Sequence, residues 1–158
     1  MTPSIAQFMR DLEQVWDAHQ QALIQRRDLQ AALAQLAAEP AITHIPAMTG
    51  GTGRQAVERF YAGQFLPHLP ADLTLRRISR TVDRWRLVDE TTVSFTHDRE
   101  LPWLLPGAEP TFRRAEVLAI AVVGFDRTRI RSQRVLWDYA TLAVQLDITA
   151  PAATGLAR

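Results

Sequence analysis

The feature that most constrains the fold is a change in hydrophobic period close to residue 70. Before this point apolar residues recur every three or four positions, the spacing of amphipathic helices; after it they alternate, the spacing of half-buried strands. A chain with helices first and strands afterwards is expected to adopt an α+β fold. No repeat or low-complexity linker divides it, so we expect a single domain over 1–158, with an ordered core at about 4–148 and a frayed tail at 149–158.

Three helices are predicted in the first part of the chain. The first begins at Thr2-Pro3, a capping side chain followed by proline at the first helical position. The second begins at Asp28 and is expected to end at Pro40, because proline cannot continue a helix. A short strand, AITHI at 41–45, separates the second helix from the third.

Four strand-like runs follow, and residues typical of tight turns lie between them. Asp83-Arg84 and Asp126-Arg127 occupy the positions of hairpin turns, so we expect an antiparallel sheet. A last short helix, YATLAVQLD, follows the final strand.

A glycine-rich segment, MTGGTGR at 48–54, precedes the third predicted helix. Such segments bind phosphate where they expose backbone N–H groups at a helix N-terminus. This one has neither the G-x-x-x-x-G-K-[ST] nor the G-x-G-x-x-G spacing, and the chain contains no lysine. Thr52 and Gln55 have the spacing of a capping box, which satisfies those N–H groups internally. We therefore interpret the segment as a turn and a helix cap.

Charge and composition exclude several classes of function. The net charge of +1 does not indicate a nucleic-acid partner, and no apolar run approaches the roughly 20 residues that span a bilayer. The absence of cysteine excludes disulfides and thiolate chemistry, and the absence of lysine excludes a Schiff base. The N-terminus lacks the features of a secretory signal, so a cytoplasmic protein is expected.

Three ionisable residues are predicted on strand faces that also carry apolar residues: His44, His97 and Asp138. A carboxylate and imidazoles among apolar walls can act as general acid and base. The alternatives are hydrogen-bonded core histidines and an aspartate that caps the last helix. Two histidines and an aspartate also resemble a facial metal site, but their spacing is scattered, and we expect neither a metal nor a cofactor.

The segment DRELPWLLPGAEP, 98–110, is too apolar for a free loop and is expected to cover a pocket or to pack at a subunit interface. A set of further residues is predicted to line a ligand cavity, with ordinary core packing as the alternative for the aromatic ones. These residues are Trp16, His19, Phe60, Tyr61, Trp103 and Arg134.

The run EVLAIAVVGF, 116–125, is apolar on both faces of the strand that it predicts. Each face therefore needs a cover, and the helices supply only one. A second subunit is the simplest cover for the other face, so a homodimer through the sheet is expected. Arg127, Arg129 and Arg131 alternate on one strand face and are interpreted as the polar rim of this dimer interface.

Over about 4–148 the chain resembles the nuclear transport factor 2-like superfamily, and within it the SnoaL-like branch. The motifs that carry the resemblance are TGGTGR, FTHDRELPWLLPG and a WD followed by a short helix that ends in QL. The resemblance implies a cone in which three N-terminal helices pack on a strongly curved antiparallel sheet and enclose a pocket. The same fold hosts cyclases, isomerases, dehydratases, hydrolases and non-catalytic modules.

The resemblance also implies roles for the candidate residues. SnoaL-like cyclases use an aspartate on the last strand as acid and base, and Asp138 stands close to that place. The dehydratase branch uses His with Asp, as His44, His97 and Asp138 can. The epoxide hydrolase branch needs an Asp-Arg-Asp relay, for which Arg134 shares a face with Asp138 but no second aspartate is in phase. The Tyr-Asp pair of the steroid isomerases has no match here.

The function expected from the sequence is that of a pocket protein for a small molecule. As a cofactor-free enzyme it would act on a small apolar carbonyl or hydroxylated compound, with Asp138 as the base and His44 and His97 as proton donors. The alternative is a ligand-binding or protein-association module without turnover.

Overall fold

The computed structural model describes residues 1–149, and the expected tail at 149–158 lies almost entirely outside them. Within this part of the chain the helices are α1 (Ile5–Gln20), α2 (Leu29–Ala34), α3 (Arg54–Phe60) and α4 (Tyr139–Leu146). Wider helical turns at Gln21–Gln25 and Tyr61–Phe65 extend α1 and α3, and a tight turn at Leu66–His68 follows. The strands are β1 (Leu36–Ile45), β2 (Thr49–Thr52), β3 (Thr74–Val82), β4 (Arg86–Thr96), β5 (Arg114–Asp126) and β6 (Arg129–Trp137).

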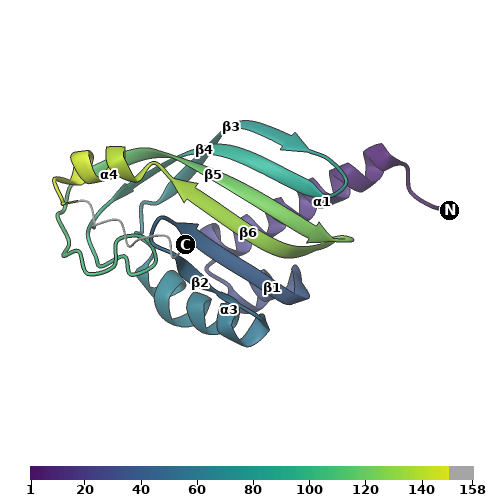
Figure 1. Cartoon of the computed structure of the whole chain (residues 1–158), viewed down its shortest axis with the longest axis horizontal. Coiled ribbons are helices and arrows are strands. Elements are labelled where there is room, and N and C mark those ends of the chain that lie inside the picture. The colour runs from purple at the N-terminus through teal and green to yellow at the C-terminus, as the bar shows by residue number, and fades with distance from the viewer. Residues whose placement is uncertain (150–158) are drawn as a thin grey trace, which may run out of the picture.

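The six strands form one sheet in the order β2-β1-β6-β5-β4-β3 (Figure 1). Hairpins join β3 to β4 and β5 to β6, as the turn residues predicted. The sheet is mixed, however, because β1 runs parallel to β6. The expectation of a wholly antiparallel sheet was wrong at this pair. No hairpin joins β1 to β6, so no tight turn requires them to run in opposite directions.

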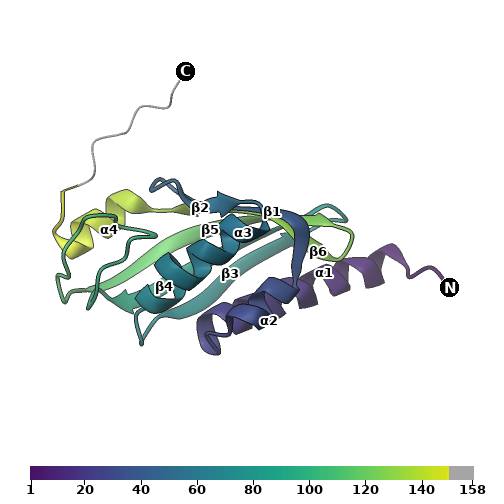
Figure 2. The same cartoon turned by 90° about the horizontal axis from the view of Figure 1, so that it is seen from below.

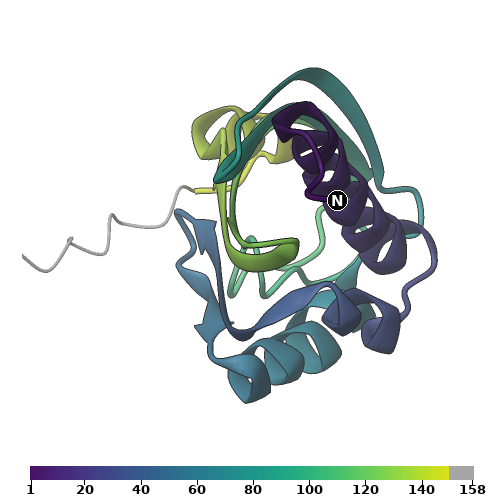
Figure 3. The same cartoon turned by 90° about the vertical axis from the view of Figure 1, so that its right-hand side faces the viewer.

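The sheet is strongly curved, and α1 lies on its concave side (Figure 3). Along β5 the residues that face this side are buried, from Val117 to Val123 at every second position, which confirms the predicted alternation. α4 lies at the opposite end of the molecule from the N-terminus (Figure 2). The α+β cone is therefore the observed architecture.

Helix starts agree with the sequence prediction more closely than helix ends. Ser4, two residues after the predicted cap, accepts a hydrogen bond from the N–H of Gln7, and Asp28 accepts one from Ala31 as expected. The second helix ends at Ala34, and Pro40 lies inside β1. The helix prediction for residues 35–40 was wrong because the pairing of Leu36 with Ile130 of β6 and the burial of Leu36, Ala37 and Pro40 override the helical propensity of this stretch.

The glycine-rich segment forms strand β2 and not a capping box. Gly53 is the N-cap of α3, and no side chain caps that helix end. A Cβ at Gly50 would lie 1.8 Å from the carbonyl oxygen of Ile42, and one at Gly51 would lie 2.8 Å from the backbone of Ala56. The glycines are thus required by close backbone approach between β2, β1 and α3.

Within the described residues no helix is both long and apolar enough to cross a bilayer.

Candidate functional site

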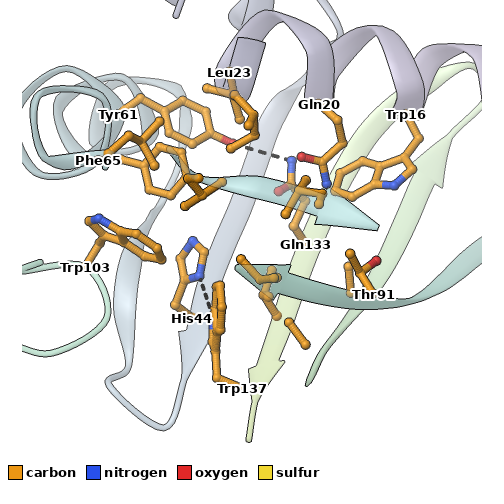
Figure 4. A pocket seen from close by; sticks show the side chains of 18 residues that line it. Trp16, Gln20, Leu23, His44, Tyr61, Phe65, Thr91, Trp103, Gln133 and Trp137 are labelled. Atoms are coloured by element: carbon orange, nitrogen blue, oxygen red, sulfur yellow. Dashed lines mark hydrogen bonds between the residues drawn. The ribbon is translucent and has the colours of Figure 1, made fainter. Parts of the chain in front are cut away.

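A cavity of about 70 Å³ lies between the inner face of the sheet and α1, with the 61–73 segment and Trp103 closing it (Figure 4). By this measure a single water needs about 10–15 Å³, so the space suits a small organic molecule. Its lining is mostly aliphatic and aromatic. The polar side chains in the lining are Gln20, His44, Thr91 and Gln133, together with the hydroxyl of Tyr61 and the indoles of Trp16, Trp103 and Trp137.

The cavity adjoins a wider and more polar compartment of about 370 Å³ between α1 and strands β3 and β4. The two spaces share five lining residues, Gln20, Ile24, Leu73, Leu75 and Thr91. Charged residues line only the outer compartment, where Arg80 and Asp89 face it. A ligand that enters through it therefore passes from a charged mouth to an apolar interior.

His44 presents a neutral N–H group to the cavity. Its Nδ1 accepts a hydrogen bond from the indole N–H of Trp137 at 3.2 Å. Since an indole only donates, the ring proton of neutral His44 is on Nε2. Burial lowers the pKa of His44 to about 4, so the ring is uncharged at neutral pH. Its other nitrogen points into the cavity (Figure 4).

The aromatic surroundings of His44 explain this burial. Its ring centroid lies 5.4 Å from that of Trp103 and 5.6 Å from that of Phe65, and Phe60 and Trp137 complete the enclosure at 5.8 and 6.3 Å. These contacts come from β1, α3 and the turn after it, β6 and the 97–113 segment. They hold the imidazole in one orientation, with little room for a second rotamer.

A second polar group is formed by His19, Tyr61 and Gln133 at the α1 side of the cavity. The hydroxyl of Tyr61 lies 3.0 Å and the amide nitrogen of Gln133 lies 2.8 Å from Nε2 of His19. Nδ1 of His19 lies 2.9 Å from the carbonyl oxygen of Ala32. Burial lowers the pKa of His19 to about 4, against the opposing effect of that backbone bond. Burial also raises the pKa of Tyr61, so the whole group is uncharged at neutral pH.

An Asp-Arg-Asp arrangement does occur, at the cavity mouth. Nε of Arg80 on β3 donates to Asp89 on β4 at 2.7 Å, and its Nη2 donates to Asp17 on α1 at 2.7 Å. The indole of Trp16 donates to the other oxygen of Asp89 at 2.8 Å. Arg134, the sequence candidate for such a relay, is exposed and does not line the cavity. Sequence reasoning missed the cluster because its members lie on three separate elements.

Asp138 does not line the cavity, which contradicts the expected convergence of the three catalytic candidates. Its two carboxylate oxygens accept hydrogen bonds from the N–H and hydroxyl of Thr141 at 3.1 and 2.6 Å, and these bonds lower its pKa. Asp138 is therefore the exposed N-cap of α4. Strand alternation explains the outcome, because Trp137 faces the cavity and its neighbour in sequence faces away.

His97 is buried, as its strand phase predicted, but it also lies outside the cavity lining. It follows the end of β4, and its Nδ1 accepts from the N–H of Thr111 at 3.3 Å. Burial lowers its pKa, and its Nε2 has no hydrogen-bond partner among the described residues. His44 is thus the one catalytic candidate of the three that reaches the cavity.

Of the predicted ligand-contacting aromatics, Trp16, Tyr61 and Trp103 line the cavity, whereas His19 and Phe60 are buried behind its lining. Sequence reasoning missed Gln20, Phe65, Gln133 and Trp137. For Gln133 and Trp137 a signal existed. Both side chains lie on the same, inward face of β6 as Val135. A polar side chain at such an inward position indicates a cavity wall, as an inward histidine does.

The apolar segment after β4 closes one end of the cavity. Leu101, Trp103, Leu104 and Leu105 are all buried, and Trp103 lies in the cavity wall. The hydroxyl of Thr49 donates to the carbonyl oxygen of Trp103 at 2.5 Å, and the Trp103 indole donates to the carbonyl of His68 at 3.4 Å. This arrangement agrees with the expectation that the segment covers a pocket, which was the alternative to packing at a subunit interface.

In the part of the chain that the structure describes, no group of three or more His, Asp or Glu side chains is placed to hold a metal ion.

Comparisons with known proteins find the same fold in solved structures. No family model matches the chain, and no curated protein matches it. An NTF2-like protein of unknown function from Burkholderia pseudomallei K96243 is 25% identical, over 89% of this chain and 98% of that one, with a TM-score of 0.66. A putative SnoaL-like polyketide cyclase from Jannaschia sp. CCS1 is 13% identical, over 95% and 98%, with a TM-score of 0.72.

A third similar structure carries a bound ligand. It is a hypothetical protein with a ketosteroid isomerase-like fold from Catenulispora acidiphila DSM 44928, in complex with trimethylamine. It is 13% identical, over 85% of this chain and 93% of that one, with a TM-score of 0.64.

Proposed function

We propose that this chain, which has the nuclear transport factor 2-like fold, binds a small uncharged carbonyl compound in its cavity. In this proposal the carbonyl oxygen accepts a hydrogen bond from Nε2–H of His44, and the apolar remainder of the ligand contacts the aromatic walls. The observation that carries the proposal is the donor fixed by Trp137 at 3.2 Å inside an otherwise largely apolar space. A hydrogen bond formed there, away from water, polarises the carbonyl.

The chemistry of His44 favours a donor over a base. Its Nδ1 lone pair is occupied by Trp137 and its Nε2 carries the proton, so the neutral ring has no free lone pair. A pKa of about 4 also keeps it from carrying a charge near neutrality. An anionic ligand would gain no counter-charge from the cavity lining, whose described residues include no arginine. The supported ligand is therefore neutral.

Binding of cyclohexanone, followed by the fluorescence of the three tryptophans in the cavity wall, tests the proposal. We expect saturable binding that weakens about tenfold or more in His44→Phe, which keeps the aromatic packing and removes the donor. The matched control is Asp138→Asn, at the exposed helix cap, which is expected to bind as the wild type does. Equal affinities in wild type and His44→Phe would remove His44 from ligand recognition.

The second candidate is cofactor-free acid and base catalysis on the same kind of ligand. The observation in its favour is Asp89, a buried carboxylate in the outer compartment that adjoins the cavity. Both of its oxygens already accept hydrogen bonds, from Arg80 and Trp16. Exchange of the α-protons of cyclohexanone in D₂O tests this candidate: exchange that Asp89→Asn abolishes favours an enzyme, and exchange at the buffer rate favours a binding protein.

We also propose that the outer face of the sheet forms a homodimer. Leu118, Ile120 and Val122 are only half-buried on that face, and Leu136 on the neighbouring strand is 42% exposed. Burial of such apolar surface in an interface stabilises the dimer by about 25 cal/mol per Å² removed from water. A second copy across a two-fold axis presents the same face and is self-complementary.

A further inference from the structure

The side-chain amide of Gln133 lines the cavity from β6 (Figure 4). His19, which lies behind the cavity lining, determines the orientation of this amide. The carbonyl oxygen of Ala32 can only accept, so the neutral His19 ring carries its proton on Nδ1. Nε2 of His19 is therefore an acceptor, and the Gln133 amide must present its NH₂ group to it at 2.8 Å. The reverse orientation would place two lone pairs against each other.

The second hydrogen of the same NH₂ group is directed to the hydroxyl of Tyr61 at 3.4 Å. Both amide hydrogens of Gln133 are thus used within the protein. Its carbonyl oxygen, Oε1, accepts no hydrogen bond from the described residues. Gln133 as a whole is only 4% exposed and lines the cavity, and Oε1 is not among the described buried side-chain atoms that lack both a partner and solvent contact. An amide oxygen that faces a cavity can accept from water, and a ligand that fills the space displaces that water. A ligand that donates to Oε1 replaces the lost hydrogen bond, whereas an apolar ligand does not.

We propose that Gln133 Oε1 is a specificity-determining acceptor and that the ligand is a hydroxy-carbonyl compound. The carbonyl half of this inference rests on the proposed function of His44; the hydroxyl half rests on Gln133 alone. A simple ketone leaves Oε1 of Gln133 without a donor. A simple alcohol has one oxygen to bond both His44 and Gln133, whereas a hydroxy ketone has a separate oxygen for each. A fluoro derivative, with fluorine in place of the hydroxyl, is similar in size and lacks the donor.

Calorimetric titration of the full chain with a matched ligand series tests the inference. The series contains cyclohexanone, its 2-, 3- and 4-hydroxy derivatives, which place the hydroxyl at increasing distances from the carbonyl, and the corresponding fluoro derivatives. We expect at least one hydroxy isomer to bind about five- to tenfold more tightly than cyclohexanone, and the fluoro derivative at the same position to lack that gain. In Gln133→Met, which is similar in shape but lacks the amide oxygen, the gain is expected to disappear.

The outcomes separate this inference from the proposed function. If cyclohexanone binds and no hydroxy isomer gains affinity, the role of Gln133 is wrong and that of His44 stands. If no ketone binds, both are wrong. Tyr61→Phe keeps the Gln133 amide and is expected to keep the preference for the hydroxy isomer over cyclohexanone. If Tyr61→Phe loses this preference and Gln133→Met retains it, Tyr61 recognises the hydroxyl and the inference is overturned. If Gln133→Met fails to fold, Gln133→Glu, which keeps the shape and an acceptor oxygen, takes its place and is expected to keep the preference for the hydroxy isomer; loss of the preference there would overturn the inference.

Discussion

The indole N–H of Trp137 lies 3.2 Å from Nδ1 of His44 and thereby selects the tautomer of the only histidine in the described cavity lining. The two residues lie on β6 and β1, which are 93 positions apart in sequence and adjacent and parallel in the sheet. The cavity donor thus depends on the one parallel pairing in the sheet. A substitution at Trp137 should therefore change the tautomer of His44, although His44 itself is unchanged.

The first prediction concerns this tautomer. Trp137→Phe keeps an aromatic ring and removes the donor, so both neutral tautomers of His44 become accessible. We expect ketone affinity to fall about twofold, since with two similarly populated tautomers only half of the molecules still present Nε2–H. The ¹⁵N shifts of the imidazole report the tautomer directly. Trp85→Phe, at a tryptophan that is 62% exposed, is the matched control and should leave those shifts as they are.

The second prediction separates stability from binding at Asp138. Asp138→Ala removes the oxygens that accept from Thr141, and we expect the thermal unfolding midpoint to fall by about 2–4 °C. Asp138→Asn should lower the unfolding midpoint much less, because asparagine caps a helix nearly as well as aspartate. Ketone affinity should stay the same in both variants, because this residue lies outside the cavity lining. A loss of affinity without a loss of stability would contradict this assignment.

The third prediction is an acid-sensitive stability that comes from buried histidines. The pKa values of His19 and His44 are lowered by burial from 6.5 to about 4. Between these values the unfolded chain binds protons that the folded chain does not, so stability is complete above about pH 6.5 and falls as the pH drops towards 4. Each histidine contributes at most about 3 kcal/mol to this loss. Urea unfolding at pH 7.5 and 4.5 measures it, and His44→Phe should reduce the difference; an unchanged difference would count against His44.

The fourth prediction concerns the glycines of β2. Gly50→Ala places a Cβ where the carbonyl of Ile42 lies, at a φ of +138°, so we expect loss of β1–β2 pairing and a fall in stability of at least about 3 kcal/mol. Gly63→Ala is the matched control, because nothing lies within 4 Å of its Cβ and its backbone is helical. It should be neutral or slightly stabilising. Denaturant titration of both variants makes the comparison, and similar midpoints would mean that the chain relaxes at Gly50.

The fifth prediction tests the homodimer. Ile120→Glu puts a charge in the middle of the outer sheet face, and a dimer through that face should become a monomer. Val144→Glu adds the same charge at a position that is 80% exposed on α4 and should leave the mass unchanged. Light scattering at micromolar concentration measures both. A wild type that is already monomeric would mean that this face needs no second copy.

Local patterns determined much of the fold. The alternation in β4, β5 and β6 depends on the two-residue repeat of any strand, and the turns at Asp83 and Asp126 depend on their own few residues, so each was readable without its neighbours. The cap at Asp28 was predicted for the same reason, and the cap at Asp138 was the alternative to the catalytic role expected for that residue. The inward phase of His44 and His97 also followed from alternation alone, and both side chains are buried.

Long-range pairing decided the rest. Residues 36–40 have helical composition, yet they enter β1, because Leu36 pairs with Ile130 of β6, the regular parallel pairing resumes at Ala41, and Leu36, Ala37 and Pro40 are buried. The same pairing brings His44 to Trp137, whereas His97 lies past the end of its strand and Asp138 one residue beyond the inward position. Which inward residues share a cavity depends on sheet order and curvature, and these arise from contacts between distant segments that no local pattern contains.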